Sequence, residues 1–306
     1  MKWSDLTEIA IASSADGTEQ PSLYLAPKSP LNESVPLLVY LHSWSTDYHQ
    51  DNTDWLREAA ARGWLFIQPN FRGQNDTPQA CGSKLARQDI LDAVEWMQSK
   101  YPVDSRRIYL AGTSGGGHMT MLMAGHHPDR FSAASAWVGI GDIAEWYRFH
   151  VKEGQPDKYA DDIVKSLGGP PGTSDEIDAE YRDRSPQFHI RRAVGLPLDI
   201  AAGVTDGHTG SVPIQHSLLV FNELAKVQKL PLVSAREIDE LWTNQKLTTP
   251  GKSDQGIDPT YEREIFLRRT AGKCRVTIFD GGHEGLPHAA CEWLSHQQRE
   301  TKTPSK

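Results

Sequence analysis

Six short apolar runs that alternate with segments of helical periodicity constrain the fold of this chain more than any other feature. The runs are rich in Val, Ile, Leu and Tyr and have the length of buried strands, at 36–41, 64–68, 107–111, 133–138, 197–201 and 275–279. Apolar residues recur at three- and four-residue spacing in the helix candidates 53–61, 84–99, 116–126, 212–227 and 286–296. Such alternation predicts βα units on a mainly parallel sheet.

A hairpin and two insertions complete this prediction. Residues 6–12 and 21–26 flank Ala15-Asp16-Gly17-Thr18, whose Asp-Gly pair is a hairpin turn signal. We therefore expect an eight-stranded, mostly parallel sheet with helices on both faces, in one domain over residues 1–306. Residues 142–195 and 230–272 break the alternation and are expected to be insertions. Insertions of this kind are often lids or pocket walls, and surface decoration or an oligomer contact is the alternative.

Composition excludes several classes of protein. The formal net charge is −8, and Lys and Arg form no cluster, so we expect no nucleic-acid partner. Three cysteines, far apart in the sequence, indicate neither a disulfide framework nor a CxxC metal site, and suit a reducing compartment. No apolar stretch reaches the length of a membrane span, so no membrane partner is expected. A cytoplasmic location is the expectation, with a removed signal peptide left open as the alternative.

The pentapeptide Gly112-Thr113-Ser114-Gly115-Gly116 matches G-x-S-x-G. It follows a strand candidate directly and precedes a helix candidate, which is the context that a nucleophile elbow requires. Side chains two positions before and after the serine would collide with the neighbouring strand and helix, which explains the glycines. We therefore predict that Ser114 is a nucleophile; a glycine-rich helix start with a capping serine is the alternative.

A serine hydroxyl needs a base within hydrogen-bond distance and a third group that orients the base. His283 lies in a small-residue loop after the last strand candidate and is the predicted base. Asp206 follows the end of another buried strand candidate and is the predicted acid. Asp142 is the rival acid, with a helix cap as its alternative role.

No metal or other cofactor is expected. Glu284 beside His283 suggests a zinc motif, but His288 stands five residues after His283 with Pro287 between them, unlike H-E-x-x-H.

The oxyanion hole needs two backbone N–H donors. Gly115, directly after Ser114, is expected to supply one of them, and Trp44, in the loop after the first long parallel strand, the other. The alternative is that His42 and Trp44 merely pack against the end of the sheet. Residues near these loops are possible pocket residues, namely His42, Ser43, His118, Trp146 and His208.

Several segments together resemble the catalytic domain of the prolyl-oligopeptidase-like and acetyl-xylan-esterase-like branch of the α/β hydrolases. They are the elbow, the Asp206 and His283 loops, Pro69-Asn70-Phe71-Arg72-Gly73, Asp89-Ile90-Leu91-Asp92-Ala93-Val94-Glu95-Trp96, Val103-Asp104-Ser105-Arg106-Arg107-Ile108 and Arg184-Ser185-Pro186. The segments span roughly residues 35 to 295 in the family's order. The resemblance implies an α/β-hydrolase fold, the triad Ser114, Asp206 and His283, and hydrolysis of an ester or amide.

Two departures from the family pattern shape the expected activity. Peptidases of this family usually carry a large β-propeller, and only about 35 residues precede the hydrolase part here, so we expect an esterase rather than a peptidase. The family's His-Gly-Gly loop reads His42-Ser43-Trp44, which leaves the second oxyanion donor open.

The expected function is therefore that of a serine carboxylic ester hydrolase working through an acyl-enzyme. Its expected partner is a small-molecule or carbohydrate ester, such as an acetylated carbohydrate, because Trp44 and Trp146 would suit stacking on a sugar ring. The alternatives are a small serine aminopeptidase or oligopeptidase, and a non-catalytic hydrolase-fold binding protein. The sequence leaves a homo-oligomer possible.

Overall fold

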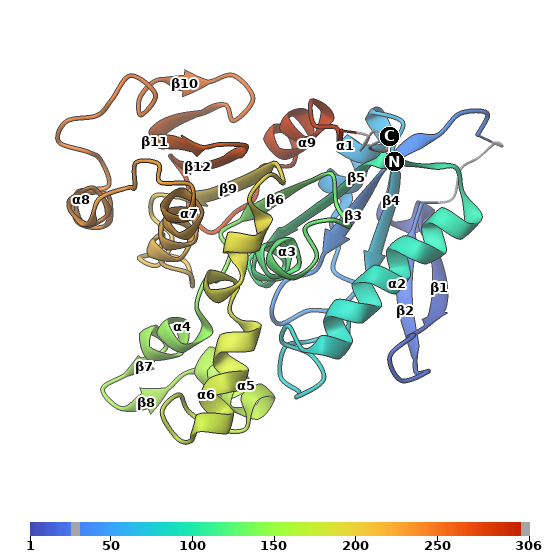
Figure 1. Cartoon of the computed structure of the whole chain (residues 1–306), viewed down its shortest axis with the longest axis horizontal. Helices are drawn as coiled ribbons and strands as arrows, with labels where there is room; N and C mark the ends of the chain where they lie inside the picture. Colours follow the sequence, from blue (N-terminus) through green and yellow to red (C-terminus); the bar gives the residue numbers. More distant parts are fainter. Residues whose placement is uncertain (26–30, 301–306) are drawn as a thin grey trace, which may run out of the picture.

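The computed structural model describes residues 1–25 and 31–300, and its centre is a twisted sheet (Figure 1). In the described part of the chain this sheet has ten strands in the order β1-β2-β4-β3-β5-β6-β9-β12-β11-β10. The strands from β4 to β12 pair in parallel, and the two on each flank pair antiparallel. The mainly parallel sheet expected from the sequence is confirmed.

The elements have the following bounds. The sheet strands are β1 Thr7–Ala12, β2 Glu19–Tyr24, β3 Val35–Leu41, β4 Leu65–Pro69, β5 Val103–Thr113, β6 Ala133–Trp137, β9 Leu198–Gly203, β10 Ile257–Asp258, β11 Arg263–Ala271 and β12 Cys274–Phe279, and a separate hairpin is formed by β7 Val151–Lys152 and β8 Gln155–Pro156. The α-helices are α1 Thr53–Ala61, α2 Lys84–Lys100, α3 Gly115–His126, α4 Ile143–Phe149, α5 Lys158–Leu167, α6 Asp175–Arg184, α7 Gln215–Val227, α8 Ala235–Asn244 and α9 Pro287–Ser295. Short 3-10 turns are η1 Trp3–Asp5, η2 Pro186–Phe188 and η3 Ile190–Ala193.

The expected strands and helices agree with these bounds to within a few residues. The helix expected from residue 212 begins at Gln215 instead. Residue 26, the last of the expected second strand, lies outside the described residues, as do residues 301–306 of the expected domain.

The strand order determines which face each helix covers. The chain passes from β3 through α1 to its neighbour β4, then reverses through α2 to β5 on the other side of β3. Because parallel crossovers are right-handed, this reversal puts α1 on the opposite face from α2 and α3. Contacts agree, since α1 packs against α9, whereas α3 and α7 both contact η3. The carboxyl ends of β3 and β5 thus flank the point where the order reverses, a common ligand position in open α/β sheets.

The sheet has two more strands than the sequence predicts, β10 and β11, both inside the segment expected to be an insertion. β11 reads Arg263-Glu264-Ile265-Phe266-Leu267-Arg268-Arg269-Thr270-Ala271 and pairs antiparallel with β12. Its buried positions are Ile265, Leu267 and Ala271, and charged residues fill much of the rest, which hid the strand periodicity. Near the edge of a sheet, charged side chains can remain solvated or paired; Arg268 pairs with Asp258 at 2.6 Å.

The first insertion, residues 142–195, folds as α4, the β7–β8 hairpin, α5 and α6, followed by the two 3-10 turns. In Figure 1 its helices α4, α5 and α6 lie together at one end of the molecule. Its apolar side chains form a second, smaller core, which also contains Trp44 and Val212 from outside the insertion. The insertion is therefore packed directly on two loops at the carboxyl end of the sheet.

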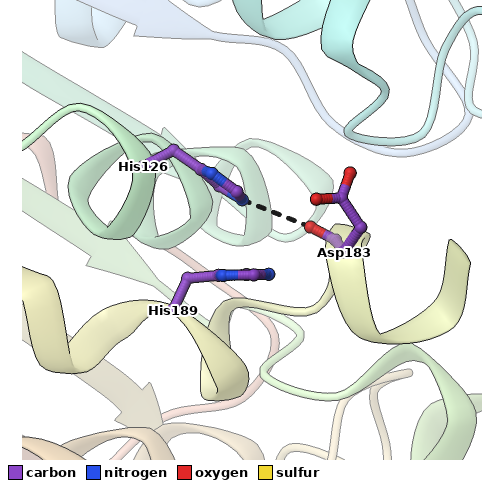
Figure 2. A group of neighbouring side chains, drawn as sticks. All are labelled: His126, Asp183 and His189. Atoms are coloured by element: carbon purple, nitrogen blue, oxygen red, sulfur yellow. Dashed lines mark hydrogen bonds between the residues drawn. The ribbon is translucent and has the colours of Figure 1, made fainter. Parts of the chain in front are cut away.

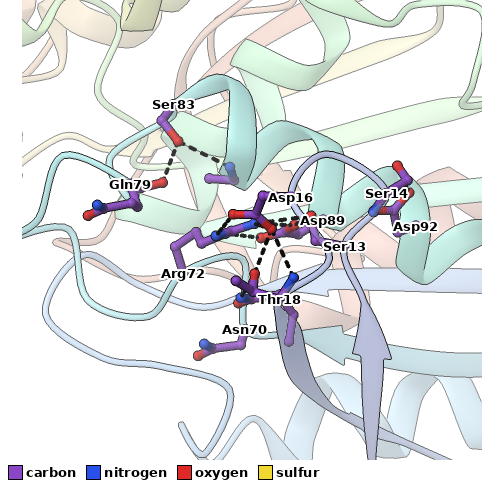
Figure 3. A network of polar contacts seen from close by, with 12 residues as sticks. Ser13, Ser14, Asp16, Thr18, Asn70, Arg72, Gln79, Ser83, Asp89 and Asp92 are labelled. Carbon is purple, nitrogen blue, oxygen red and sulfur yellow. Dashed lines mark hydrogen bonds and ion pairs between the residues drawn. The ribbon is translucent and has the colours of Figure 1, made fainter.

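An ion-pair network, buried at Asp89 and exposed at Asp16, fixes the turn after β4 (Figure 3). Phe71 and Arg72 have positive φ angles of 34° and 79°, conformations that L-residues adopt rarely and only when their surroundings hold them. Arg72 Nε lies 2.6 Å from Asp89 Oδ2, and its guanidinium also contacts Asp16 at 2.8 Å. The hydrogen bond from Arg72 holds the pKa of Asp16 well below its usual range. Arg72 thereby ties the β1–β2 hairpin to α2.

Two further properties bear on the sequence-based expectations. None of the helices within residues 1–25 and 31–300 combines the length and the apolar character that a membrane span requires. The three cysteines, Cys81, Cys274 and Cys291, are buried and free.

We predict that Arg72→Met lowers the free energy of unfolding by about 3–5 kcal/mol, because it leaves the buried Asp89 carboxylate without its cation. Arg57→Met is the matched control: Arg57 forms an exposed pair with Asp54, and its loss should cost less than about 1 kcal/mol. Urea denaturation monitored by tryptophan fluorescence measures both. Equal effects of the two variants would contradict the role given to Arg72.

Candidate active site

Ser114 occupies a strained turn between β5 and α3. Its φ and ψ are 61° and −118°, and its N–H donates to the carbonyl of Trp137 at 2.9 Å. A Cβ atom at Gly112 would lie 2.4 Å from the backbone of Gly116, and one at Gly116 would lie 2.1 Å from the carbonyl oxygen of Leu41. Only glycine fits at these two positions, so the close approach of α3 to the sheet forces Ser114 out at the carboxyl edge.

His283 reaches Ser114 from the loop that follows β12. Its Nε2 atom lies 2.8 Å from Ser114 Oγ, although 169 positions separate the residues in sequence. The ring is partly exposed, with a side-chain exposure of 25%. The imidazole is thus within proton-transfer distance of the hydroxyl and still open to a bound molecule.

Asp206 contacts the other ring nitrogen from the loop after β9. Its two carboxylate oxygens lie 3.0 and 2.9 Å from His283 Nδ1, and its side chain is fully buried. The N–H groups of Gly207 and Val212 donate to Oδ1 at 2.9 and 3.2 Å, which fixes the carboxylate in place. A buried carboxylate at Nδ1 selects the tautomer in which Nε2 can accept a proton from the serine.

Asp142, the rival acid, lies elsewhere. Its carboxylate caps α4 and accepts from the N–H groups of Ala144 and Glu145 at 2.8 and 3.2 Å. Burial raises the pKa of Asp142. In the structure Asp142 is therefore a helix cap, which is the alternative role given to it from the sequence.

Gly115 and Trp44 bring two backbone N–H groups together beside Ser114. A Cβ atom at Gly115 would lie 2.3 Å from the backbone nitrogen of Trp44, so the first turn of α3 packs directly on the loop after β3. Gly115 is also the first residue of α3, where N–H groups lack partners within the helix and the helix dipole is positive. The two backbone nitrogens thus lie near each other beside Ser114, which is where an oxyanion hole for this hydroxyl would need its donors.

A cavity of about 430 Å³ opens over Ser114 and His283. Apart from these two residues, its lining is aromatic or neutral and polar: Tyr40, Ser43, Trp44, Ser45, Thr46, Gln50, Asn52, Trp55, Thr113, Tyr159 and Gly285. A wider cavity of about 710 Å³ adjoins it and shares Asn52, Trp55 and Gly285. The described lining of the smaller cavity thus contains no lysine, arginine, aspartate or glutamate, whereas that of the wider cavity includes Lys2, Asp51, Asp54 and Arg57.

Among the possible pocket residues, Ser43 lines this cavity and the other four do not. His42 is buried against Phe71, with ring centroids 3.9 Å apart, and burial lowers its pKa. His118 points from α3 toward the carbonyl oxygen of Arg184 at 2.7 Å, and burial lowers its pKa to about 4.

Trp146 and His208 are also turned away from the cavity. Trp146 is fully buried beneath Trp44, with ring centroids 4.7 Å apart, so it offers no free face to a sugar. Trp44 itself is only 1% exposed, which removes the stacking argument for both rings. His208 stacks on Trp242 at 3.8 Å and contacts its carbonyl oxygen.

Sequence reasoning missed Gln50, which organises the loop after β3. Its side-chain oxygen accepts from Ser43 N–H and from Thr46 Oγ1, both at 2.7 Å. It also missed Ser211, whose hydroxyl lies 3.4 Å from His283 Nε2. The sequence feature that could have pointed to Gln50 is its position seven residues after Ser43 in the same loop. For Ser211, that feature is its position in the long loop between Asp206 and Pro213.

The described residues contain one group with metal-ligand chemistry, formed by His126, Asp183 and His189 (Figure 2). Their ligand atoms lie within 4.8 Å of one another. However, Arg87 Nη1 lies 3.0 Å from His126 Nε2, and Arg87 Nη2 lies 2.9 Å from Asp183 Oδ2. The guanidinium donates to both, so it uses lone pairs that a bound cation would need. His126 and Asp183 are thus hydrogen-bond partners of Arg87, and His189 Nε2 contacts the carbonyl oxygen of Arg182 at 3.0 Å.

The sheet order, the elbow after β5 and the loops after β9 and β12 define an α/β-hydrolase fold. Residues 50–237 match the prolyl oligopeptidase family, and the chain belongs to this family.

Known relatives agree with this assignment. The chain is 24% identical over 275 residues to acylamino-acid-releasing enzyme 1 of Oryza sativa subsp. japonica, covering 83% of this chain and 32% of the relative. It is 23% identical over 127 residues to acetylxylan esterase A of Emericella nidulans, covering 39% of this chain and 41% of the relative. A solved structure of acylaminoacyl peptidase from Pyrococcus horikoshii superposes with a TM-score of 0.64 at 16% identity, covering 98% of this chain and 43% of that one. This chain thus matches less than half the length of each relative.

We predict that Gly116→Ala lowers the free energy of unfolding by about 1–3 kcal/mol or more, because the new methyl group meets the Leu41 carbonyl. Gly282→Ala is a matched control in the same region: its Cβ atom would have its nearest neighbour at 3.4 Å. Thermal and urea denaturation compare the two. A Gly116→Ala protein as stable as wild type would disprove the close approach of α3 to β3.

Proposed function

We propose that this chain is a serine hydrolase that cleaves carboxylic esters through an acyl-enzyme. The observation that carries the proposal is the continuous hydrogen-bonded series from Asp206 through His283 to Ser114. Three groups from three separate loops have little structural reason to meet at the mouth of a cavity, whereas nucleophilic catalysis requires this arrangement. Membership of a hydrolase family supports the same reading.

In the proposed first half-reaction, Ser114 Oγ attacks the ester carbonyl carbon while its proton passes to His283 Nε2. Asp206 stabilises the resulting imidazolium, and the N–H groups of Gly115 and Trp44 donate to the tetrahedral oxyanion. The bond to the leaving oxygen then breaks, and the alcohol takes the proton from Nε2. An acyl group remains on Ser114.

In the second half-reaction, a water molecule attacks the acyl carbon and gives its proton to Nε2. The bond between the acyl carbon and Ser114 Oγ breaks, Oγ takes the proton back, and the carboxylic acid leaves. No other reactant is needed for this cycle.

The neutral cavity supports an ester with an uncharged acyl group over a substrate with a free amino terminus. A peptide α-amino group is cationic at neutral pH, and burying it without a carboxylate partner is costly. The described lining contains no aspartate or glutamate. An acylated amino-acid substrate has no such charge, so an acylaminoacyl peptidase remains the second candidate, favoured by the similarity to acylamino-acid-releasing enzyme 1.

For the alcohol, we propose a hydroxyl-rich group such as an acetylated carbohydrate. The polar part of the lining includes the hydroxyl oxygens of Ser45 and Thr46, which can accept hydrogen bonds from a sugar, whereas the side chains of Gln50 and Asn52 are paired within the protein. The similarity to acetylxylan esterase A supports the same choice. Hydrogen bonds, rather than stacking on Trp44 or Trp146, would then hold the sugar.

We predict that Ser114→Ala lowers kcat for a short p-nitrophenyl ester by about 10⁶ and Asp206→Asn by about 10⁴. Asp142→Asn is the matched control: asparagine caps helices as well as aspartate does, so this variant should keep wild-type kcat. A fluorophosphonate probe should label wild type at Ser114 and fail to label Ser114→Ala. An unlabelled wild-type protein would favour the non-catalytic binding protein instead.

We further predict the order of substrates in a panel of acetylated xylan oligomers, an N-acetyl amino-acid amide and an amide with a free amino terminus. The acetyl ester should have the highest kcat/KM and the free amine the lowest, because the described lining of the smaller cavity has no carboxylate to pair with an ammonium group. Faster turnover of the N-acetyl amide would favour the acylaminoacyl peptidase. Faster turnover of the amide with a free amino terminus would contradict the inference that the uncharged cavity disfavours an ammonium group.

A further inference from the structure

Ser211 places a second hydroxyl at the working nitrogen of His283. Its Oγ atom lies 3.4 Å from Nε2, the nitrogen that also contacts Ser114 Oγ at 2.8 Å. A ring nitrogen carries either one proton or one lone pair, so it can serve only one of the two hydroxyls fully. In the free enzyme Ser114 Oγ makes the shorter contact with Nε2. Ser211 Oγ is the hydroxyl that can take its place.

The first insertion holds Ser211 in this position. The backbone carbonyl of Ser211 accepts from Trp146 Nε1 at 2.7 Å and from His150 Nε2 at 2.9 Å. Both donors are buried, and His150 is itself fixed by Asp157, which contacts its Nδ1 at 2.6 Å. A carbonyl with two buried donors leaves its residue little freedom, so the hydroxyl cannot drift far from His283.

The neighbours of Ser211 along the chain are held as well. The N–H of Val212 donates to Asp206 at 3.2 Å. On the other side, a Cβ atom at Gly210 would lie 2.2 Å from Asp206 Oδ1 and 2.6 Å from His283 Cβ, so the loop passes the acid and the base at van der Waals distance. The path of the loop, rather than a chance rotamer, thus brings Ser211 to Nε2.

We propose that Ser211 is a positioning residue that keeps His283 in its working orientation after Ser114 has been acylated. This inference rests on the proposed function. In the acyl-enzyme, Ser114 Oγ is an ester oxygen and has no proton to donate to Nε2. The hydroxyl of Ser211 then donates to the free nitrogen until the attacking water replaces it there, and by rotating it accepts from Nε2–H once the water has given up its proton. Ser211 keeps its own proton throughout.

The test separates the two half-reactions. With p-nitrophenyl acetate, stopped-flow measurement gives the acylation burst, and acid quench followed by intact mass spectrometry gives the fraction of acyl-enzyme. Ser211→Ala should acylate within about twofold of wild type but deacylate about three- to tenfold more slowly, the size of one neutral hydrogen bond. Its acyl-enzyme should therefore accumulate. Ser211→Thr, which keeps a hydroxyl, should restore most of the deacylation rate.

Thr209→Ala is the matched control on the same loop, because Thr209 Oγ1 contacts Thr205 rather than His283. It should match wild type in both steps. If Ser211→Ala deacylated at the wild-type rate, or if its acylation and deacylation slowed equally, the proposed role of Ser211 would be wrong. The proposed triad would not be affected. Absence of an acyl adduct on wild-type Ser114 would overturn the proposed function and this inference together.

Discussion

The close contact between the first turn of α3 and the ends of the central strands is the constraint on which the rest of this site depends. The turn fits only because Gly112 has no side chain where β5 meets α3, and Gly116 has none where α3 meets β3. Strain at Ser114 is acceptable because α3, which is buried along almost its whole length, is anchored in the core. The same turn brings Gly115 close to the backbone nitrogen of Trp44.

Topology then collects the remaining groups. Parallel strands end at the same edge of a sheet, so the loops after β3, β5, β9 and β12 meet there although the chain separates them widely. Each loop contributes one part: a backbone donor, a hydroxyl, a carboxylate and an imidazole. The first insertion does more than decorate this edge, since its buried Trp146 and His150 hold the loop that carries the carboxylate.

Features with a local signature were the predictable ones. The strands from β3 to β12 in the parallel core follow from apolar runs, and the elbow follows from glycines between a strand and a helix. β11 was not predicted from the sequence because three arginines and one glutamate interrupt its apolar residues. These charged residues are tolerated because the strand lies near the edge of the sheet. The directions of His118 and Trp146 were also unpredictable, because packing partners such as the Arg184 carbonyl come from segments distant in sequence. The contact of Ser211 with His283 likewise depends on a loop path that no periodicity encodes.

The smaller apolar core has a consequence for how this protein opens. It joins side chains of the insertion, such as Ile143 and Leu167, to Trp44 in one loop of the site and Val212 in another. Segments that share a core exchange their amide protons as one cooperative unit. Thermal fluctuations that loosen the insertion should therefore disorder both loops at once, whereas the elbow, which is anchored in the main core, stays protected. During partial unfolding, Ser114 would then keep its position while the loops that contain Trp44 and Val212 lose their structure.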